Sequence, residues 1–164
     1  MNQPLKKSEQ RNQSNRDRQP NFQGGDRQQQ SEVAQEIINT IQGLKESEGR
    51  SLKDYPIRTL VKHAEAFGPE LKRQRLETNQ VRKFLDAVNQ LKAKLIGKDF
   101  SSIETEVVLL KPKLAYAAAR QDAVKALNRV MSEAIDKVHS KADFDRLVQL
   151  MESIIAYHKA EGGK

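Results

Sequence analysis

The sequence predicts an all-α fold: a compact bundle of about five or six helices behind a disordered N-terminal tail. From Ser31 onward, apolar residues recur at the helical period, and no segment sustains the alternation of a strand. Residues 1–30 are dominated by Gln, Asn, Arg and Ser, so they cannot bury enough surface to offset their ordering entropy. We therefore expect a single helical-bundle domain over residues 31–164.

The first two predicted helices flank a glycine-containing loop. The first begins after a Ser31 N-cap. The second has Pro56 in its first turn and is stopped by Gly68 and Pro69. Residues 71–76 then form a basic connector or one more helical turn. The apolar stripes of these helices are Val33, Ile37, Ile38, Ile41 and Leu44, and Ile57, Leu60, Val61, Ala64 and Phe67.

The third and fourth predicted helices are separated by Gly97. Thr78 caps the third helix, and Gly97 provides its C-terminal stop. Lys83 and Lys94 lie near the pole opposite its apolar stripe, where ordinary solvated charges are expected. The fourth helix covers about residues 101–110. The stripe of the third helix is Val81, Phe84, Leu85, Val88, Leu91 and Leu95.

Pro112 begins a fifth predicted helix, the longest in the chain. Lys111 is the extended residue before it, and no breaker interrupts the apolar series that continues to Val138. Ser140 and Asp143 then resemble a capping box for the final helix. The two apolar stripes are Val124, Leu127, Met131, Ile135 and Val138, and Phe144, Leu147, Val148, Met151, Ile154 and Ile155.

Residues 110–120, L-K-P-K-L-A-Y-A-A-A-R, form the candidate site. Lys113, Tyr116, Ala117 and Arg120 recur at helical spacing and share one face. Two cations about 10 Å apart along a helix with an aromatic between them can follow a single-stranded nucleic-acid backbone. On one continuous helix, however, Lys113 and Arg120 also extend an apolar seam. Their stems can snorkel over the core, Arg120 can pair with a buried carboxylate, or the helix start can meet a partner. The residues alone favour packing and binding equally.

Composition favours a polyanionic partner and gives no sign of an enzyme. The net charge is +7 and the isoelectric point about 9.6. The absence of cysteine excludes disulfides, thiolate metal sites and cysteine nucleophiles. His63, His139 and His158 have no ligand or nucleophile spaced beside them, so we expect them at the surface or rim. We expect no catalytic residue, cofactor or metal site.

The hydropathy pattern predicts a cytoplasmic protein without a membrane segment. No apolar run approaches the ~20 residues that span a bilayer. The first residues are polar where a signal peptide needs an apolar core.

Two blocks of the sequence resemble the small subunit of type III-A CRISPR effector complexes. Residues 110–120 closely resemble that family's signature. Residues 76–84, L-E-T-N-Q-V-R-K-F, resemble a segment in which Thr or Ser and Gln precede a hydrophobic residue and an Arg. The helical stretch at residues 60–67 and the spacing also agree, so the resemblance covers roughly residues 31–160 and leaves out the tail.

The resemblance implies a helical, non-catalytic subunit present in several copies. Such subunits stack along a filament beside the backbone and large subunits and line the channel that holds target RNA paired to CRISPR RNA. The phosphate contacts that the resemblance implies are Arg82, Lys83, Lys111, Lys113 and Arg120. Charge and helix face add Arg58, Lys62 and Arg75. Phosphate contacts set position and affinity, while pairing to the guide supplies specificity.

The alternative is a protein of a different class. A helical adaptor with the same basic face would dock an acidic protein partner and never meet RNA. The salt dependence of RNA binding separates the two hypotheses.

Overall fold

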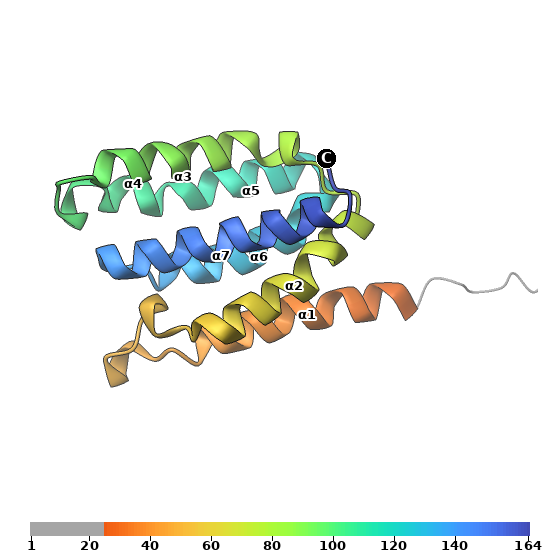
Figure 1. Ribbon diagram of the computed structural model, residues 1–164, viewed down its shortest axis with the longest axis horizontal. Coiled ribbons are helices and arrows are strands. Elements are labelled where there is room, and N and C mark those ends of the chain that lie inside the picture. Colours follow the sequence, from red (N-terminus) through yellow and green to blue (C-terminus); the bar gives the residue numbers. More distant parts are fainter. Residues whose placement is uncertain (1–24) are drawn as a thin grey trace, which may run out of the picture.

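The computed structural model describes residues 25–164, with side chains from residue 32 onward, and this part of the chain contains only helices, turns and loops (Figure 1). The predicted all-α fold is confirmed. The predicted tail falls on residues 1–24, which lie outside the described residues, and on residues 25–30, which belong to the first helix. The α-helices are α1 (Gly25–Gln42), α2 (Ile57–Arg73), α3 (Arg82–Leu95), α4 (Glu104–Val108), α5 (Leu110–Arg120), α6 (Lys125–Asp136) and α7 (Lys141–Ala160).

The long helices lie along one direction in three tiers (Figure 1). One outer tier is α1 with α2, the middle tier is α6 with α7, and the other outer tier contains α3, α4 and α5. The most extensive packing joins α2 to α7, and α6 packs between α1 and α5. The middle tier therefore separates α2 from the face formed by α3 and α5.

Most residues of the predicted apolar stripes are buried in the core, and two residues of the stripe on α2 are exposed. Side chains such as Ile41, Phe67 and Phe84 are almost fully buried, and each such burial stabilises the fold by about 1.5–3 kcal/mol. Ile57 and Val61 are instead 44% and 36% exposed. The side of α2 that faces the core carries Leu60, Ala64, Phe67 and Leu71. Ile57 and Val61 therefore lie on the outer flank of the helix.

Two predicted helix starts are wrong. Ser31 is not a cap, because α1 already begins at Gly25; the intervening glutamines are good helix formers and include no breaker. Thr78 lies in a 3-10 turn, Thr78–Val81, and α3 begins at Arg82. The capping box belongs to Glu77, whose N–H donates to Gln80 Oε1 at 3.1 Å.

The predicted stop at Gly68 and Pro69 is also wrong, because α2 continues to Arg73. A Cβ on Gly68 would lie 2.6 Å from the backbone N of His158, so glycine allows the backbones of α2 and α7 to approach closely. This packing holds the helix together at Pro69, where one backbone hydrogen bond is missing. The sequence predicts a basic connector or one more helical turn at residues 71–76. The helical turn is confirmed up to Arg73, where α2 ends.

Helix α2 ends in a Schellman motif with an unusual residue. The N–H of Leu76 donates to Leu71 O and that of Arg75 donates to Lys72 O, both at 2.9 Å. Arg75 takes the left-handed position, φ 66°, which glycine usually occupies. The motif points the chain toward α3.

The long fifth helix predicted from Pro112 to Val138 does not exist as one element. Gln121 is extended (φ −135°, ψ 111°) and separates α5 from α6. The chain reverses there, so that α5 and α6 pack against each other and bury Leu114 and Ala118. One straight rod could not bury both halves in this way. The longest helix is α7, with 20 residues.

Other helix ends follow the sequence more closely. Gly97 ends α3 with φ 68°, and Ser140 Oγ accepts from the Asp143 N–H at 3.2 Å, as the capping prediction requires. Pro112 lies in the first turn of α5 as predicted. Lys111 is helical and not extended, because α5 begins at Leu110; proline is tolerated there, since the first turn of a helix has no partners for its N–H groups.

The histidines are not all at the surface. His139 is exposed and contacts Glu46, and His63 is half-buried beside Tyr55. His158 is fully buried, which contradicts the prediction, and its Nε2 lies 2.7 Å from the Leu76 carbonyl oxygen. The turn after α2 therefore rests on α7.

Candidate nucleic-acid interface

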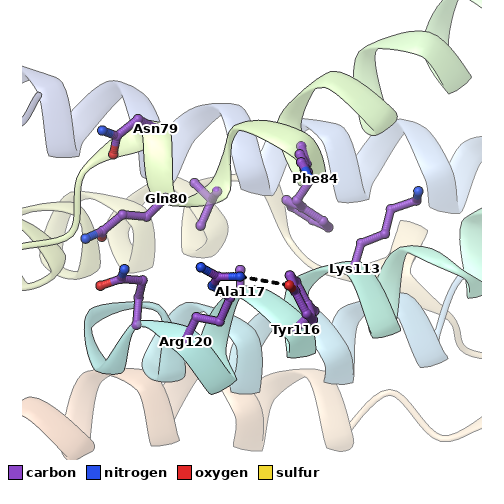
Figure 2. Close-up of a pocket in the computed structure, with 10 residues that line it drawn as sticks. Asn79, Gln80, Phe84, Lys113, Tyr116, Ala117 and Arg120 are labelled. Carbon is purple, nitrogen blue, oxygen red and sulfur yellow. Dashed lines mark hydrogen bonds between the residues drawn. The ribbon is translucent and has the colours of Figure 1, made fainter.

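The main candidate site is a hollow of about 340 Å³ between the start of α3 and the outer face of α5 (Figure 2). We call it the α3–α5 hollow. It is lined by Asn79, Gln80, Val81, Lys83, Phe84, Lys113, Tyr116, Ala117, Arg120 and Gln121. The predicted face of Lys113, Tyr116, Ala117 and Arg120 is thus confirmed as a single lining surface. Helix α3 adds a third cation, Lys83.

Tyr116 and Arg120 form the centre of the hollow (Figure 2). Arg120 Nη1 donates to the Tyr116 hydroxyl at 2.9 Å, and the guanidinium carbon lies 5.6 Å from the ring centroid. Helical spacing of four residues makes this contact possible. The hydrogen bond and the positive charge of Arg120, with a contribution from Lys83, lower the pKa of Tyr116. Tyr116 is nevertheless 60% exposed, so the pair orders the ring without covering it.

The three cations of the hollow have no acidic partner among the described residues. Lys83, Lys113 and Arg120 are exposed and make no ion pair there. Four lysines elsewhere do form ion pairs, among them Lys92 with Glu152, Lys94 with Glu106 and Lys125 with Asp122. This contrast distinguishes Lys83 from Lys94, which the position on the helix alone places on the same solvated side.

The structure rejects one explanation for Arg120. It does not pair with a buried carboxylate, because its partner is an exposed tyrosine hydroxyl. It does not head a long apolar seam either, since α5 ends at Arg120 itself. Its guanidinium therefore lies at the surface near the C-terminal end of α5, hydrogen-bonded to Tyr116.

The other predicted site residues lie outside the lining of the hollow. Arg82 is exposed and adjoins Lys83 in the chain. Lys111 Nζ donates to Asp136 Oδ1 at 2.6 Å, so its charge is directed to α6. Arg75 is exposed in the turn after α2. Arg58 and Lys62 flank Ile57 and Val61 around a separate hollow of about 320 Å³ on α2.

Sequence reasoning missed the polar rim and the floor of the hollow. Asn79, Gln80 and Gln121 supply amides, and Phe84 is the buried floor. Asn79 and Gln80 belong to the block at residues 76–84 that resembles the family, so that block could have indicated them as lining residues. Gln121 lines the hollow because the chain leaves the helix there, and no Pro or Gly marks that break.

A match to a known family covers most of the chain and assigns it to that family. The sequence model of the family described as Csm2 Type III-A matches residues 54–164. The chain belongs to the Csm2 Type III-A family. A curated relative, "CRISPR system Cms protein Csm2" of Streptococcus thermophilus, is 31% identical over 91 residues, which are 54% of this chain and 75% of the relative. No solved structure matches the chain.

Family membership makes this chain a small subunit of the type III-A CRISPR complex, and it confirms the resemblance. The complex contains other subunits and CRISPR RNA. The matched region includes α2 to α7 and the whole α3–α5 hollow, while α1 lies outside it.

Two kinds of feature are absent from the described residues. No helix between residues 25 and 164 combines the length and apolar composition needed to cross a bilayer. The same residues contain no cluster of three or more His, Asp or Glu side chains placed to hold a metal ion.

Proposed function

We propose that this chain is a non-catalytic, cytoplasmic subunit that holds the backbone of target RNA paired to CRISPR RNA. Lys83, Lys113 and Arg120 are the principal phosphate contacts, and Arg82 flanks them. The observation that carries the proposal is that these three cations surround one hollow and have no internal acidic partner among the described residues. Phosphate oxygens would supply the missing charge.

Contacts of this kind carry no sequence information. Lysine and arginine neutralise phosphates, which are the same at every nucleotide, so binding is set by charge and position. Base pairing with the guide RNA supplies specificity. Three contacts predict a slope of log K against log salt of about −2, at about 0.7 per phosphate of a single strand.

The remaining surfaces suit assembly with other subunits. We propose that several copies stack along the filament beside the backbone and large subunits. Ile96, Val108 and Leu109 are exposed at the α3–α4 end, and Ile57 and Val61 are exposed on α2. Arg58, Lys62, Arg75 and Lys111 lie outside the hollow and contribute less to RNA affinity in this proposal.

Fluorescence anisotropy with the full chain tests the proposal between about 50 and 200 mM salt, with a labelled RNA used both as a single strand and paired to its complement. Changing Lys83, Lys113 and Arg120 to Gln should weaken binding about tenfold or more and flatten the salt slope. The matched control changes three ion-paired lysines, Lys92, Lys94 and Lys125, to Gln. It alters the net charge equally and should change affinity less than about twofold.

Two results would overturn the proposal. Equal losses in both triple variants would mean diffuse attraction without a site. Absence of RNA binding at low salt would remove the proposed mechanism altogether.

One observation favours the alternative, an adaptor for an acidic protein. Ile57 and Val61 are exposed apolar residues that lie beside Arg58 and Lys62 on α2, and an acidic amphipathic segment fits such a surface. Changing Arg58 and Lys62 to Gln distinguishes the functions. It should abolish adaptor binding but leave RNA affinity within about twofold of the wild type.

A further inference from the structure

The shape of the α3–α5 hollow exceeds what phosphate binding needs. Phosphates bind to exposed cations on flat surfaces, whereas this site is about 340 Å³ in volume, within the range of ligand pockets. Its floor is apolar, from Val81, Phe84 and Ala117. We propose that the hollow holds one unpaired RNA base, stacked on Tyr116, with the adjoining phosphates on Lys113 and Arg120. This inference rests on the proposed function.

Tyr116 is the first observation behind this assignment. Tyr55, Phe67, Phe84 and Phe144 are almost fully buried, but Tyr116 is 60% exposed. An exposed ring held by Arg120 at 2.9 Å is already ordered before a ligand arrives, so stacking loses little further side-chain entropy. Aromatic rings of this kind stack on any base, because every base has a π face.

The polar rim is the second observation. In Figure 2 the amides of Asn79 and Gln80 lie at one end of the hollow and the Lys113 amine at the other, with Arg120 and Tyr116 between them. Gln80 Oε1 already accepts from the Glu77 N–H at 3.1 Å, so its NH₂ group remains free to donate. Amides match the edge of a base, and the lysine matches a phosphate.

Pairing decides which RNA can enter. The faces of a paired base are covered by its neighbours in the stack, so only an unpaired base can lay a face on Tyr116. An apolar peptide would fill the floor, but three cations around the opening disfavour it and favour a polyanion. The ligand is therefore one extruded nucleotide within an otherwise bound strand.

The test compares three RNA duplexes with the full chain: fully paired, with a one-nucleotide bulge, and with an abasic bulge. The base-containing bulge should bind roughly 5- to 150-fold more tightly than the other two, the range expected for stacking one base on an aromatic. A 2-aminopurine placed in the bulge should be quenched on binding.

Variants test whether the preference for the bulged duplex depends on the Tyr116 ring. Tyr116→Phe should keep the preference for the bulge, and Tyr116→Ala should reduce the ratio of bulged to paired affinity to about one. Ile96→Ala, at a residue 78% exposed outside the hollow, should leave the ratio unchanged. Circular dichroism confirms that each variant is folded.

The outcomes separate this inference from the proposed function. Equal, salt-dependent binding of all three duplexes overturns the base pocket and leaves the backbone-binding function standing. Preference for both bulges, or a preference that survives in Tyr116→Ala, also overturns the pocket. Failure to bind any RNA overturns both.

Discussion

Two clusters of polar side chains in this molecule differ in their partners. At the start of α7, Asp143 is buried and its carboxylate accepts from Ser51 Oγ at 2.6 Å, Lys53 N at 2.7 Å and His139 N at 2.9 Å. In the α3–α5 hollow, three cations have no acidic partner among the described residues. The first cluster is complete within the chain and holds the fold. The second leaves three positive charges together at the surface, and the proposed phosphate contacts rest on that observation.

The buried acids sharpen this comparison. Burial raises the pKa of Asp143, but the hydrogen bonds from Ser51, Lys53 and His139 outweigh it and lower the pKa overall. Glu70 is equally buried, and among the described residues Gln74 is its side-chain donor, at 3.1 Å. Burial, partly opposed by Arg73, raises the pKa of Glu70 to about 7. The donors around a buried acid, rather than burial alone, decide the direction.

The largest expected effect on stability comes from removing the Asp143 carboxylate, which holds the first cluster together. Asp143→Ala should lower the free energy of unfolding by on the order of 4 kcal/mol, because it leaves the three donors that face the carboxylate without a partner. Urea denaturation measures this, with the exposed Asp145→Ala as control. A change below about 1 kcal/mol would contradict the structural role.

The same carboxyl predicts a pH dependence. Its pKa is lower in the folded than in the unfolded chain, so the unfolded chain binds more protons as the pH falls through its ordinary value of 3.8. The stabilisation is therefore present above that value and is lost below it. Asp143→Ala should lack this acid-dependent loss in denaturation measured over the same pH range.

Glu70 is a buried acid with fewer donors, and its effect on stability should depend on pH in the opposite direction to that of Asp143. Glu70→Gln tests this. The folded chain binds the proton more tightly, so its stability falls as the pH rises from 4.5 to about 7. Above that range the variant should be more stable than wild type by at most about 3 kcal/mol, at about 1.4 kcal/mol per pKa unit. The difference should vanish near pH 4.5. Exposed Glu65→Gln is the control, and a pH-independent difference would contradict the assignment.

The smallest expected effect on stability belongs to the second cluster. Changing Lys83, Lys113 and Arg120 to Gln should alter the free energy of unfolding by less than about 0.5 kcal/mol, because exposed side chains contribute little to folding. Thermal melting followed by circular dichroism measures this. A loss above about 2 kcal/mol would return these cations to a packing role and erase the contrast with Asp143.

Much of the site was accessible from local sequence pattern. Lys113, Tyr116, Ala117 and Arg120 share a face because helical spacing alone places them there, and the hollow confirms that face. Lys111, which the resemblance to the family also implies as a phosphate contact, lies outside this face. Its charge reaches Asp136 on α6, a partner that no spacing within α5 reveals.

By itself, the sequence determined the helical class, most of the core and the location of the candidate face. These depend on the apolar period, which is a local property of the chain. Tertiary structure alone decided that α2 passes through Gly68 and Pro69, that Gln121 breaks the long helix, and that Lys83 joins Lys113 and Arg120. The reason is that periodicity specifies which residues share a face, whereas the opposing helices decide which face is buried, where a chain must reverse and which charges remain without a partner.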